Sequence, residues 1–383
     1  MTGISMTLTG AQVLLPRGGL SRTSLSIAGG VIVSEPAGRA VDLSGYMVLP
    51  GIVDLHGDGF ERHVAPRRGA MKQMTEGIVA AEAELAANGI TTAVLAQFYS
   101  WEGGLRSPEF ADQVFEAIRQ VRGDIVTDLI PQLRFETHLL PDYADLPERL
   151  AAWDVSYVVF NDHLPHDRLA AGKVPPRLTG QALKAGRNPD RHLQFLRDLH
   201  GSGAEVPAAL NALTPRLEQA GIRMGSHDDR TAEDREIWRK RGVRIAEFPE
   251  TIEAAEAARA GGDSVVLGAP NLVRGGSHKG NVSAVELVTM GLCDALASDY
   301  HYPSPRRAAL MLARTGICGF DEAWNLVSRG PAKVLGLTDR GELKVGNRAD
   351  LVVLDGHSDR VAATLAGGRV SYMSGDIAAR FLA

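Results

Sequence analysis

The residues of this chain that could do chemistry stand at the ends of apolar runs. The stretch LPGIVDLHGDGFERH, residues 49–63, ends its apolar part in His56 and Asp58. Alternate residues of a strand point the same way, so both side chains could bind one ion. Four later apolar runs also end in polar groups. In chain order, the first ends in Glu136 and His138, the second in Asp162 and His163, the third in His227, Asp228 and Asp229, and the fourth in Asp299.

Imidazole nitrogens and carboxylate oxygens are ligands that Zn²⁺ accepts at about 2 Å. Any one of these histidines could simply be a hydrogen-bonded surface or core residue. Five such strand ends together favour a centre with one or two divalent ions. A divalent ion lowers the pKa of a bound water to about 7, and the resulting hydroxide could attack an electrophilic centre of a substrate. Asp299 is then predicted to be the general base that passes the proton to the leaving group.

The elements that must position these residues follow from the hydrophobic pattern. Helical patterns separate most of the eight strand-like runs, for example over residues 71–88, where Asn88-Gly89 is a good helix end. The runs are GIVDLH, TTAVLAQ, DLIPQLRFETH, SYVVFNDH, IRMGSHDD, RIAEFP, SVVLGAP and DALASDY. This alternation predicts an α/β fold, a (β/α)8 TIM-like barrel whose strand ends meet at one rim.

Both ends of the chain are rich in β-branched residues and Gly turns, which predicts hairpins. We expect residues 1–48 and 340–383 to form one small composite β-sandwich module, and residues 49–339 to form the barrel. Within the barrel, residues 164–204 form a basic insertion rich in Pro and Gly. A long loop of this kind is usually a functional lid or a disordered spacer, and a lid over phosphates is our hypothesis.

Composition excludes several classes of function. The 383 residues are 44% hydrophobic and carry a net charge of −5, so a nucleic-acid-binding role is disfavoured. Cys293 and Cys318 form no CxxC pair, which favours a reducing cytoplasm. We see no signal-peptide pattern and no apolar run of membrane-spanning length, so we expect no membrane partner.

Longer segments carry a resemblance. The β-rich ends, the barrel pattern and the tail GPAKVLGL…GELKVGNRADLVVLD, residues 330–355, resemble the amidohydrolase superfamily. SHDD (226–229), AEFPETIEAAEAARAGG (246–262), GAPNLVRGGSHKGN (268–281) and SDY (298–300) resemble one branch of it closely. The resemblance implies a metal-dependent diphosphatase of phosphonate catabolism, which cleaves a triphosphate on a phosphorylated ribose to a monophosphate and pyrophosphate.

The resemblance also implies a ligand set. The metal ligands would be His56, Asp58, Glu136, His163, His227 and Asp299, with Glu136 bridging two ions. Asp162 or His166 could replace His163. Glu247 stands where many relatives have His, and we favour a buried positioning group over a substitute ligand. Asp228 and Asp229 would orient His227 or a water.

That branch shares the His-x-Asp pattern of His56 and Asp58, where other relatives have His-x-His. A carboxylate makes the ligand set harder and more anionic, and we hypothesise that this moderates the grip on a polyphosphate product. A triphosphate also needs cations. Arg274, His278 and Lys279 lie among glycines whose backbone N–H groups could approach an anion, and Arg67 and Arg68 follow the first strand. Solvated surface loops are the plainer interpretation of both segments.

Two rival functions remain. One is hydrolysis of a C–N bond, by a deaminase or cyclic amidase on the same scaffold. The basic Gly-rich segment argues against it, because neutral amides need no such cluster. The other is a non-catalytic barrel, but such relicts should have lost ligands that this chain keeps. The scaffold also suggests a homodimer.

Overall fold

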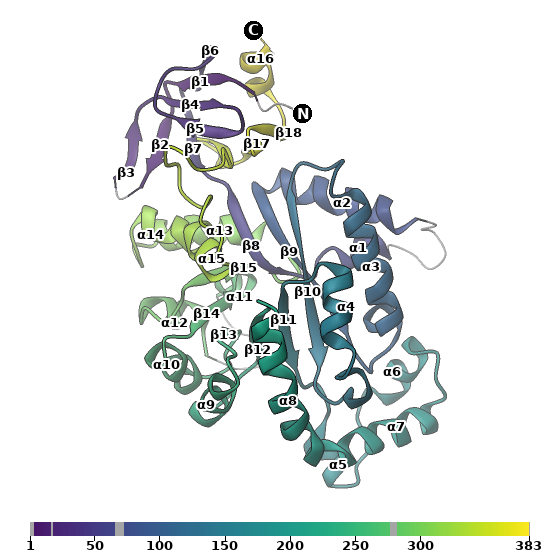
Figure 1. Ribbon diagram of the computed structural model, residues 1–383. Coiled ribbons are helices and arrows are strands. Elements are labelled where there is room, and N and C mark those ends of the chain that lie inside the picture. Colours follow the sequence, from purple (N-terminus) through teal and green to yellow (C-terminus); the bar gives the residue numbers. More distant parts are fainter. Residues whose placement is uncertain (1–3, 17, 66–72, 276–281, 383) are drawn as a thin grey trace. The chain divides into compact units, whose positions relative to one another are not determined.

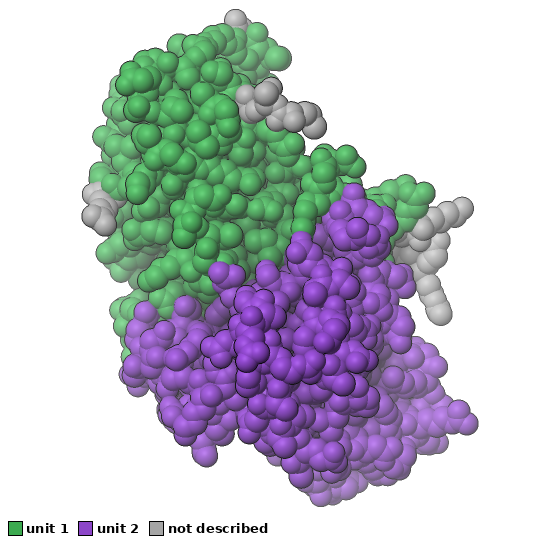
Figure 2. Space-filling model, viewed as in Figure 1, with its two compact units in different colours: residues 1–95, 121–130, 266–383 green, residues 96–120, 131–265 purple. Residues whose placement is uncertain are grey.

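The computed structural model describes residues 4–16, 18–65, 73–275 and 282–382. Figure 2 shows two compact units, one of residues 1–95, 121–130 and 266–383 and the other of residues 96–120 and 131–265. The predicted phosphate ligands Arg67, Arg68, His278 and Lys279 lie outside the described residues, so their roles stay predictions. No helix in the described ranges is long and apolar enough to span a bilayer.

Eight strands follow one another in chain order in a single parallel sheet, which confirms the predicted barrel (Figure 1). They are β8 (Ile52–Gly57), β9 (Ile90–Tyr99), β10 (Asp128–Glu136), β11 (Tyr157–Asn161), β12 (Arg223–His227), β13 (Ile245–Glu247), β14 (Ser264–Gly268) and β15 (Ala295–Ala297). Gly57 at the end of β8 forms a parallel bridge with Asp299, just beyond β15. This bridge joins the first strand to the last.

The apolar runs of the sequence form strands that are covered by helices. Every residue of β8 and of β9 is buried, as expected for parallel strands that are covered on both faces. The register of the sheet then sets the polar ends side by side. Glu136 at the end of β10 pairs with Asn161 of β11, and His227 of β12 pairs with Glu247 of β13. Residues far apart in sequence therefore meet at the carboxyl ends of the strands.

Helices occupy most of the connections between the barrel strands, and three more lie between β15 and the C-terminal strands. They are α1 (Glu61–Val64), α2 (Met74–Ala87), α3 (Pro108–Val121), α4 (Leu146–Trp153), α5 (His166–Ala170), α6 (Leu178–Lys184), α7 (Pro189–Gly201), α8 (Val206–Gln219), α9 (Ala232–Lys240), α10 (Ile252–Ala260), α11 (Ala269–Arg274), α12 (Ala284–Thr289), α13 (Ser304–Arg314), α14 (Phe320–Asn325) and α15 (Arg329–Val334). The predicted end of α2 is confirmed, because Asn88 caps the helix and Gly89 follows with φ of 84°.

The insertion at residues 164–204 is helical, so the expectation of a long loop is wrong. It contains α5, α6 and α7. Asn188 caps α7 by accepting hydrogen bonds from the backbone N–H groups of Asp190 and Arg191, and Pro189 occupies the first turn, where its missing N–H costs nothing. His192 and Leu196, four residues apart, are the buried face of α7. Pro189 therefore starts a helix instead of breaking one, while the lid hypothesis stays a prediction.

The two ends of the chain form two further sheets. One has the order β5-β4-β1-β6 and the other β18-β17-β16-β7-β2-β3. The strands are β1 (Met6–Thr9), β2 (Gln12–Leu15), β3 (Gly19–Arg22), β4 (Leu25–Ala28), β5 (Val31–Val33), β6 (Arg39–Asp42), β7 (Tyr46–Pro50), β16 (Leu351–Asp355), β17 (Val361–Ala366) and β18 (Arg369–Met373). Helix α16 (Asp376–Leu382) follows them.

Both ends of the chain contribute to one hydrophobic core. Leu8 and Ile27 from the N-terminal part share this core with Val353 and Leu365 from the C-terminal part. Val48 of β7 pairs antiparallel with Val353 of β16, so the two ends are also joined within one sheet. The pairing of the β-rich ends is confirmed. The boundaries of the predicted module, at 48/49 and 339/340, stay a prediction.

Candidate metal centre

Strand β10 carries a row of polar side chains within the unit of residues 96–120 and 131–265. Gln132, Arg134 and Glu136 alternate along the strand, so they share one face of the sheet. All three are buried. Their side chains contact, respectively, Glu247 at the end of β13, His227 at the end of β12 and His163 just after β11. One strand therefore organises the polar ends of its neighbours.

Glu136 is the carboxylate of this row, and its side chain has no exposed surface. Its Oε1 contacts His163 Nδ1. Its Oε2 accepts hydrogen bonds from the backbone N–H of His163 and from Nε1 of Trp101, both at 3.2 Å. A buried negative charge needs such donors, because burial without them is costly. Glu136 and His163 thus lie together as predicted for two ligands of one centre.

His227 lies between a cation and an anion. Arg134 Nη2 is 3.0 Å from His227 Nε2, and Glu247 Oε2 is 3.4 Å from His227 Nδ1. A guanidinium can only donate, so Nε2 accepts and the ring proton sits on Nδ1, where Glu247 accepts it. Burial lowers the pKa of His227, and the positive charge of Arg134 lowers it further. The ring is therefore neutral with its lone pair on Nε2, and a metal ion bound there would have to displace the Arg134 guanidinium.

Glu247 holds His227 from behind. It is fully buried, and its Oε1 accepts hydrogen bonds from Gln132 Nε2 at 3.0 Å and from the Tyr157 hydroxyl at 2.7 Å. Burial and the nearby Glu247 charge raise the pKa of Tyr157 well above its usual value, so this hydroxyl keeps its proton and donates it. These contacts agree with a positioning role for Glu247, in which it fixes the tautomer and orientation of His227.

The donors of this unit fit a divalent ion. His163, His227 and Asp228 each offer one ligand atom within 4.8 Å of the others, and Asp228 Oδ1 is 3.6 Å from His227 Nε2. Two imidazoles and a carboxylate, with Glu136 behind His163, are a ligand set that suits Zn²⁺. The alternatives to His163 lie elsewhere, because Asp162 and His166 contact each other and not Glu136. The ligand roles themselves stay predictions.

The other three predicted ligands meet in the unit of residues 1–95, 121–130 and 266–383, at the joined ends of β8 and β15. The backbone N–H of Asp299 donates to the carbonyl of His56 at 2.9 Å, and the N–H of Asp58 donates to the carbonyl of Asp299 at 3.0 Å. Beneath them, the Asp54 carboxylate accepts hydrogen bonds from the backbone N–H and the hydroxyl of Ser298. Burial raises the pKa of Asp54 to about 6, and the Ser298 hydrogen bonds only partly offset this.

The backbone turns sharply at three of these strand ends. Asp228, Phe248 and Asp299 have φ of 59°, 56° and 55°, a left-handed conformation that costs a residue with a side chain about 1–3 kcal/mol. They follow β12, β13 and β15 within two residues. Such strain gathers at functional sites, where the surrounding structure holds it in place. The strain therefore agrees with the prediction that the site lies at the carboxyl end of the barrel sheet, which stays a prediction.

The turn at Asp228 separates the two predicted orienting carboxylates. Asp228 Oδ1 lies 3.6 Å from His227 Nε2, so its orienting role stays a prediction. Asp229 instead accepts hydrogen bonds from the Ser226 hydroxyl at 2.6 Å and from Arg235 Nη1 at 2.9 Å. Its neighbour's left-handed φ aims it toward Arg235 of α9. The contacts of Asp229 thus support a structural ion pair.

Of the predicted phosphate ligands, Arg274 is the one that the structure describes. It ends α11, is exposed, and donates to Asn271 Oδ1 at 2.8 Å. Its guanidinium carbon is 5.7 Å from the ring centre of Tyr300, the residue after Asp299. Arg274 is therefore a cation near the Asp299 strand end.

Sequence reasoning missed two contacts in this region, those of Arg134 and Trp101. Arg134 contacts His227, and Trp101 contacts Glu136. The sequence did contain a signal for Arg134. This charged residue stands two places before Glu136, and alternate residues of a strand lie on the same face of the sheet. No comparable signal marked Trp101, which reaches Glu136 from the connection after β9.

Known proteins resemble this chain in sequence and in fold. The family model described as amidohydrolase family matches residues 182–372. The alpha-D-ribose 1-methylphosphonate 5-triphosphate diphosphatase of Escherichia coli (strain K12) is 33% identical over 322 residues, which cover 82% of this chain and 85% of that protein. The N-acetylglucosamine-6-phosphate deacetylase of Pasteurella multocida is 11% identical with a TM-score of 0.62, covering 96% of this chain and 99% of that one. Molinate hydrolase is 13% identical with a TM-score of 0.63, covering 100% and 97%; both structures are likenesses of fold.

Proposed function

This chain belongs to the amidohydrolase family, and we propose that it hydrolyses the triphosphate of α-D-ribose 1-methylphosphonate 5-triphosphate to the 5-phosphate and pyrophosphate. The observation that carries the proposal is the 33% identity to the Escherichia coli diphosphatase over most of both chains. The strand-end carboxylates and imidazoles support it, because they are suited to a metal-dependent hydrolase.

We assign metal binding to the six strand-end residues predicted from the sequence. One or two divalent ions, Zn²⁺ in this proposal, would lower the pKa of a water and withdraw charge from phosphoryl oxygens. Glu247 keeps the His227 lone pair on Nε2, and Glu136 with His163 supplies a second pair of donors. These contacts orient the rings before any ligand arrives, and binding of an ion would also require Arg134 to leave His227 Nε2.

Asp299 is our candidate general base. Water attacks a phosphorus of the anhydride, the P–O bond to the bridging oxygen breaks, and pyrophosphate leaves. In this step Asp299 removes the proton of the water and passes it to the leaving oxygen. Its backbone is fixed on both sides by the hydrogen bonds to His56 of β8 and to Asp58 just beyond that strand.

The substrate is a polyanion, and we propose that cations near the strand ends hold it. Arg274 is the described member of this set, and His278, Lys279, Arg67 and Arg68 complete the proposal. Charged hydrogen bonds to phosphate are about twice as strong as neutral ones. Neutral amide substrates need no such cations, so the set favours the anhydride over a C–N bond.

A substrate panel tests the proposal. The purified enzyme, loaded with Zn²⁺, would be assayed with the ribose triphosphate, with cyclic amides and with aminated heterocycles, and kcat/KM would be compared. We expect turnover of the triphosphate alone, and its loss in Asp299→Asn. Turnover of an amide in the absence of triphosphate cleavage would replace the proposal by C–N hydrolysis.

A further inference from the structure

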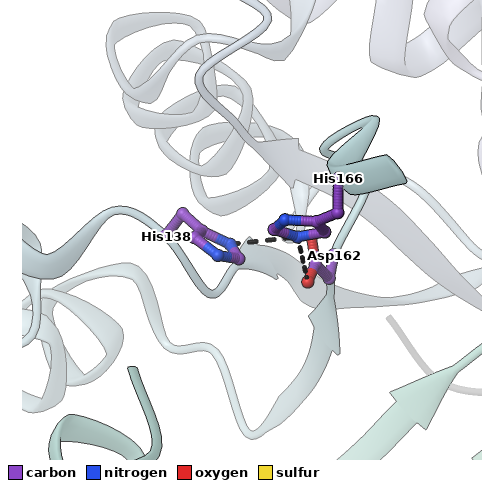
Figure 3. A group of neighbouring side chains, drawn as sticks. All are labelled: His138, Asp162 and His166. Atoms are coloured by element: carbon purple, nitrogen blue, oxygen red, sulfur yellow. Dashed lines mark hydrogen bonds and ion pairs between the residues drawn. The ribbon is translucent and has the colours of Figure 1, made fainter. Parts of the chain in front are cut away.

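A second group of imidazole and carboxylate side chains lies apart from the candidate centre, within the unit of residues 96–120 and 131–265. His138 lies two residues beyond β10, and Asp162 directly follows β11. His166 is the first residue of α5, and His200 lies in the last turn of α7. Figure 3 shows His138, Asp162 and His166 pointing toward one another. Two barrel strands and the helical insertion therefore contribute to one cluster.

The distances suit an ion. His166 Nε2 is 3.0 and 2.9 Å from the two carboxylate oxygens of Asp162, and His138 Nδ1 is 3.6 Å from Asp162 Oδ1. One ligand atom of each residue lies within 4.8 Å of the others. Tetrahedral Zn²⁺ with bonds of about 2.05 Å sets neighbouring ligand atoms about 3.3 Å apart. The two contacts with Asp162 bracket this value, so shifts of a few tenths of an ångström would admit the ion there.

His200 orients one of these donors. Its Nδ1 is 2.8 Å from His166 Nδ1, and two ring nitrogens at that distance share one proton. Without an ion, His166 Nε2–H donates to the Asp162 carboxylate, which can only accept. A bound ion would replace that proton, and a hydrogen bond from His166 Nδ1–H to His200 would then keep the lone pair on Nε2. Metal-binding histidines use their second ring nitrogen in this way, because the hydrogen bond fixes the tautomer and the ring.

The cluster is separate from the candidate centre although Asp162 and His163 are consecutive. His163 contacts Glu136, whereas Asp162 contacts His138 and His166. The cluster opens into a pocket of about 670 Å³, whose wall includes Val206, Leu210 and Trp238. The side chains of Asp162 and His166 are 43% and 36% exposed, so an ion could reach them from this pocket.

We propose that His138, Asp162 and His166 form a second metal site, which takes a transition-metal ion of the Zn²⁺ class and ties helix α5 to the ends of β10 and β11. Two imidazoles and one carboxylate favour Zn²⁺ over Mg²⁺ or Ca²⁺, which prefer oxygen ligands. The remaining position on the ion faces the pocket and is open to water. The ion would link the barrel to the start of the insertion.

Metal stoichiometry tests the site directly. The full chain would be stripped with chelator, reloaded with Zn²⁺, passed through gel filtration and measured by elemental analysis and calorimetry. The variants are His138→Gln and His166→Gln, with Asp162→Asn as a change that keeps the side-chain shape. The control is His357→Gln, at an exposed turn of the other unit. We expect each cluster variant to bind one Zn²⁺ fewer per chain than wild type, and the control to match wild type.

Hydrogen exchange supplies a readout that does not depend on activity. We expect Zn²⁺ to slow amide exchange over residues 166–170 in wild type and in His227→Gln, but not in His166→Gln. The His227→Gln arm separates this site from the candidate centre. The proposal is overturned if the cluster variants keep the wild-type number of Zn²⁺ ions per chain, or if Zn²⁺ binds there only at millimolar concentration. It is also overturned if Zn²⁺ does not change the rate of amide exchange in α5.

Discussion

Glu247→Gln is predicted to switch the tautomer of His227. The two donors on Glu247 Oε1, Gln132 Nε2 and the Tyr157 hydroxyl, hold the oxygen of the new amide on their side. Its NH₂ group then faces His227 Nδ1, which must become the acceptor. The ring proton moves to Nε2, where it meets the donor Arg134 and removes the lone pair that a metal needs.

The magnitude follows from the hydrogen bond that is lost. A hydrogen bond to a charged group contributes about 1.5–3 kcal/mol, and about 1.4 kcal/mol corresponds to a factor of ten in binding. We therefore expect a metal affinity about 10- to 100-fold weaker, the range measured when orienting partners of metal ligands are removed. Competition with a chromophoric chelator would give the affinity, and ¹⁵N NMR of the imidazole would give the tautomer.

Glu250→Gln is the matched control, because Glu250 is a buried carboxylate three residues away that pairs with Arg230. This variant makes the same chemical change at a carboxylate whose ion-pair partner is Arg230. We therefore expect wild-type metal affinity. Refutation is simple to recognise. If Glu247→Gln binds metal as tightly as wild type and His227 keeps its proton on Nδ1, the carboxylate does not set the tautomer.

Three further predictions concern stability and product binding. Arg235→Leu leaves the buried Asp229 carboxylate without its cation, while Asp263 keeps Arg239, so urea unfolding should show a loss of about 3–5 kcal/mol; a loss below 1 kcal/mol would contradict this. Burial raises the pKa of Asp54 to about 6, so the folded state holds this proton more tightly than the unfolded chain and stability falls as pH rises from about 4 to 6. In metal-free protein, Asp54→Asn should flatten the pH dependence of Tm across that window, and parallel wild-type and variant profiles would show the assignment to be wrong. Asp58→His makes the ligand set less anionic, so pyrophosphate inhibition should strengthen several-fold, and an unchanged inhibition constant would sink that hypothesis.

The barrel could be predicted because each buried parallel strand is a continuous apolar run. β9 is buried at all its positions, so its sequence carried no competing pattern. The insertion was harder. Pro189 and Gly201 look like loop residues in the sequence, yet they lie at the first and last positions of α7. Pro and Gly mark the limits of helices as well as loops, and burial decides between the two.

The candidate site could be predicted only as far as local pattern reaches. His56, Asp58 and Glu136 stand out because polar residues end apolar strands. The direction of Asp229 could not be read, since it depends on the left-handed φ of Asp228. The contact of His166 with His200 joins residues 34 positions apart, and only the packing of α5 against α7 brings them together.

We propose that this chain cleaves a phosphoric anhydride between the first and second phosphates of its substrate. Phosphorus NMR of the Zn²⁺-loaded enzyme with 5-triphospho-ribose 1-methylphosphonate tests it most directly, beside Asp299→Asn. We expect pyrophosphate and a 5-phosphate monoester to appear in equal amounts with wild type and not with the variant. An intact triphosphate at occupied metal sites, or release of inorganic phosphate and a diphosphate, would contradict it.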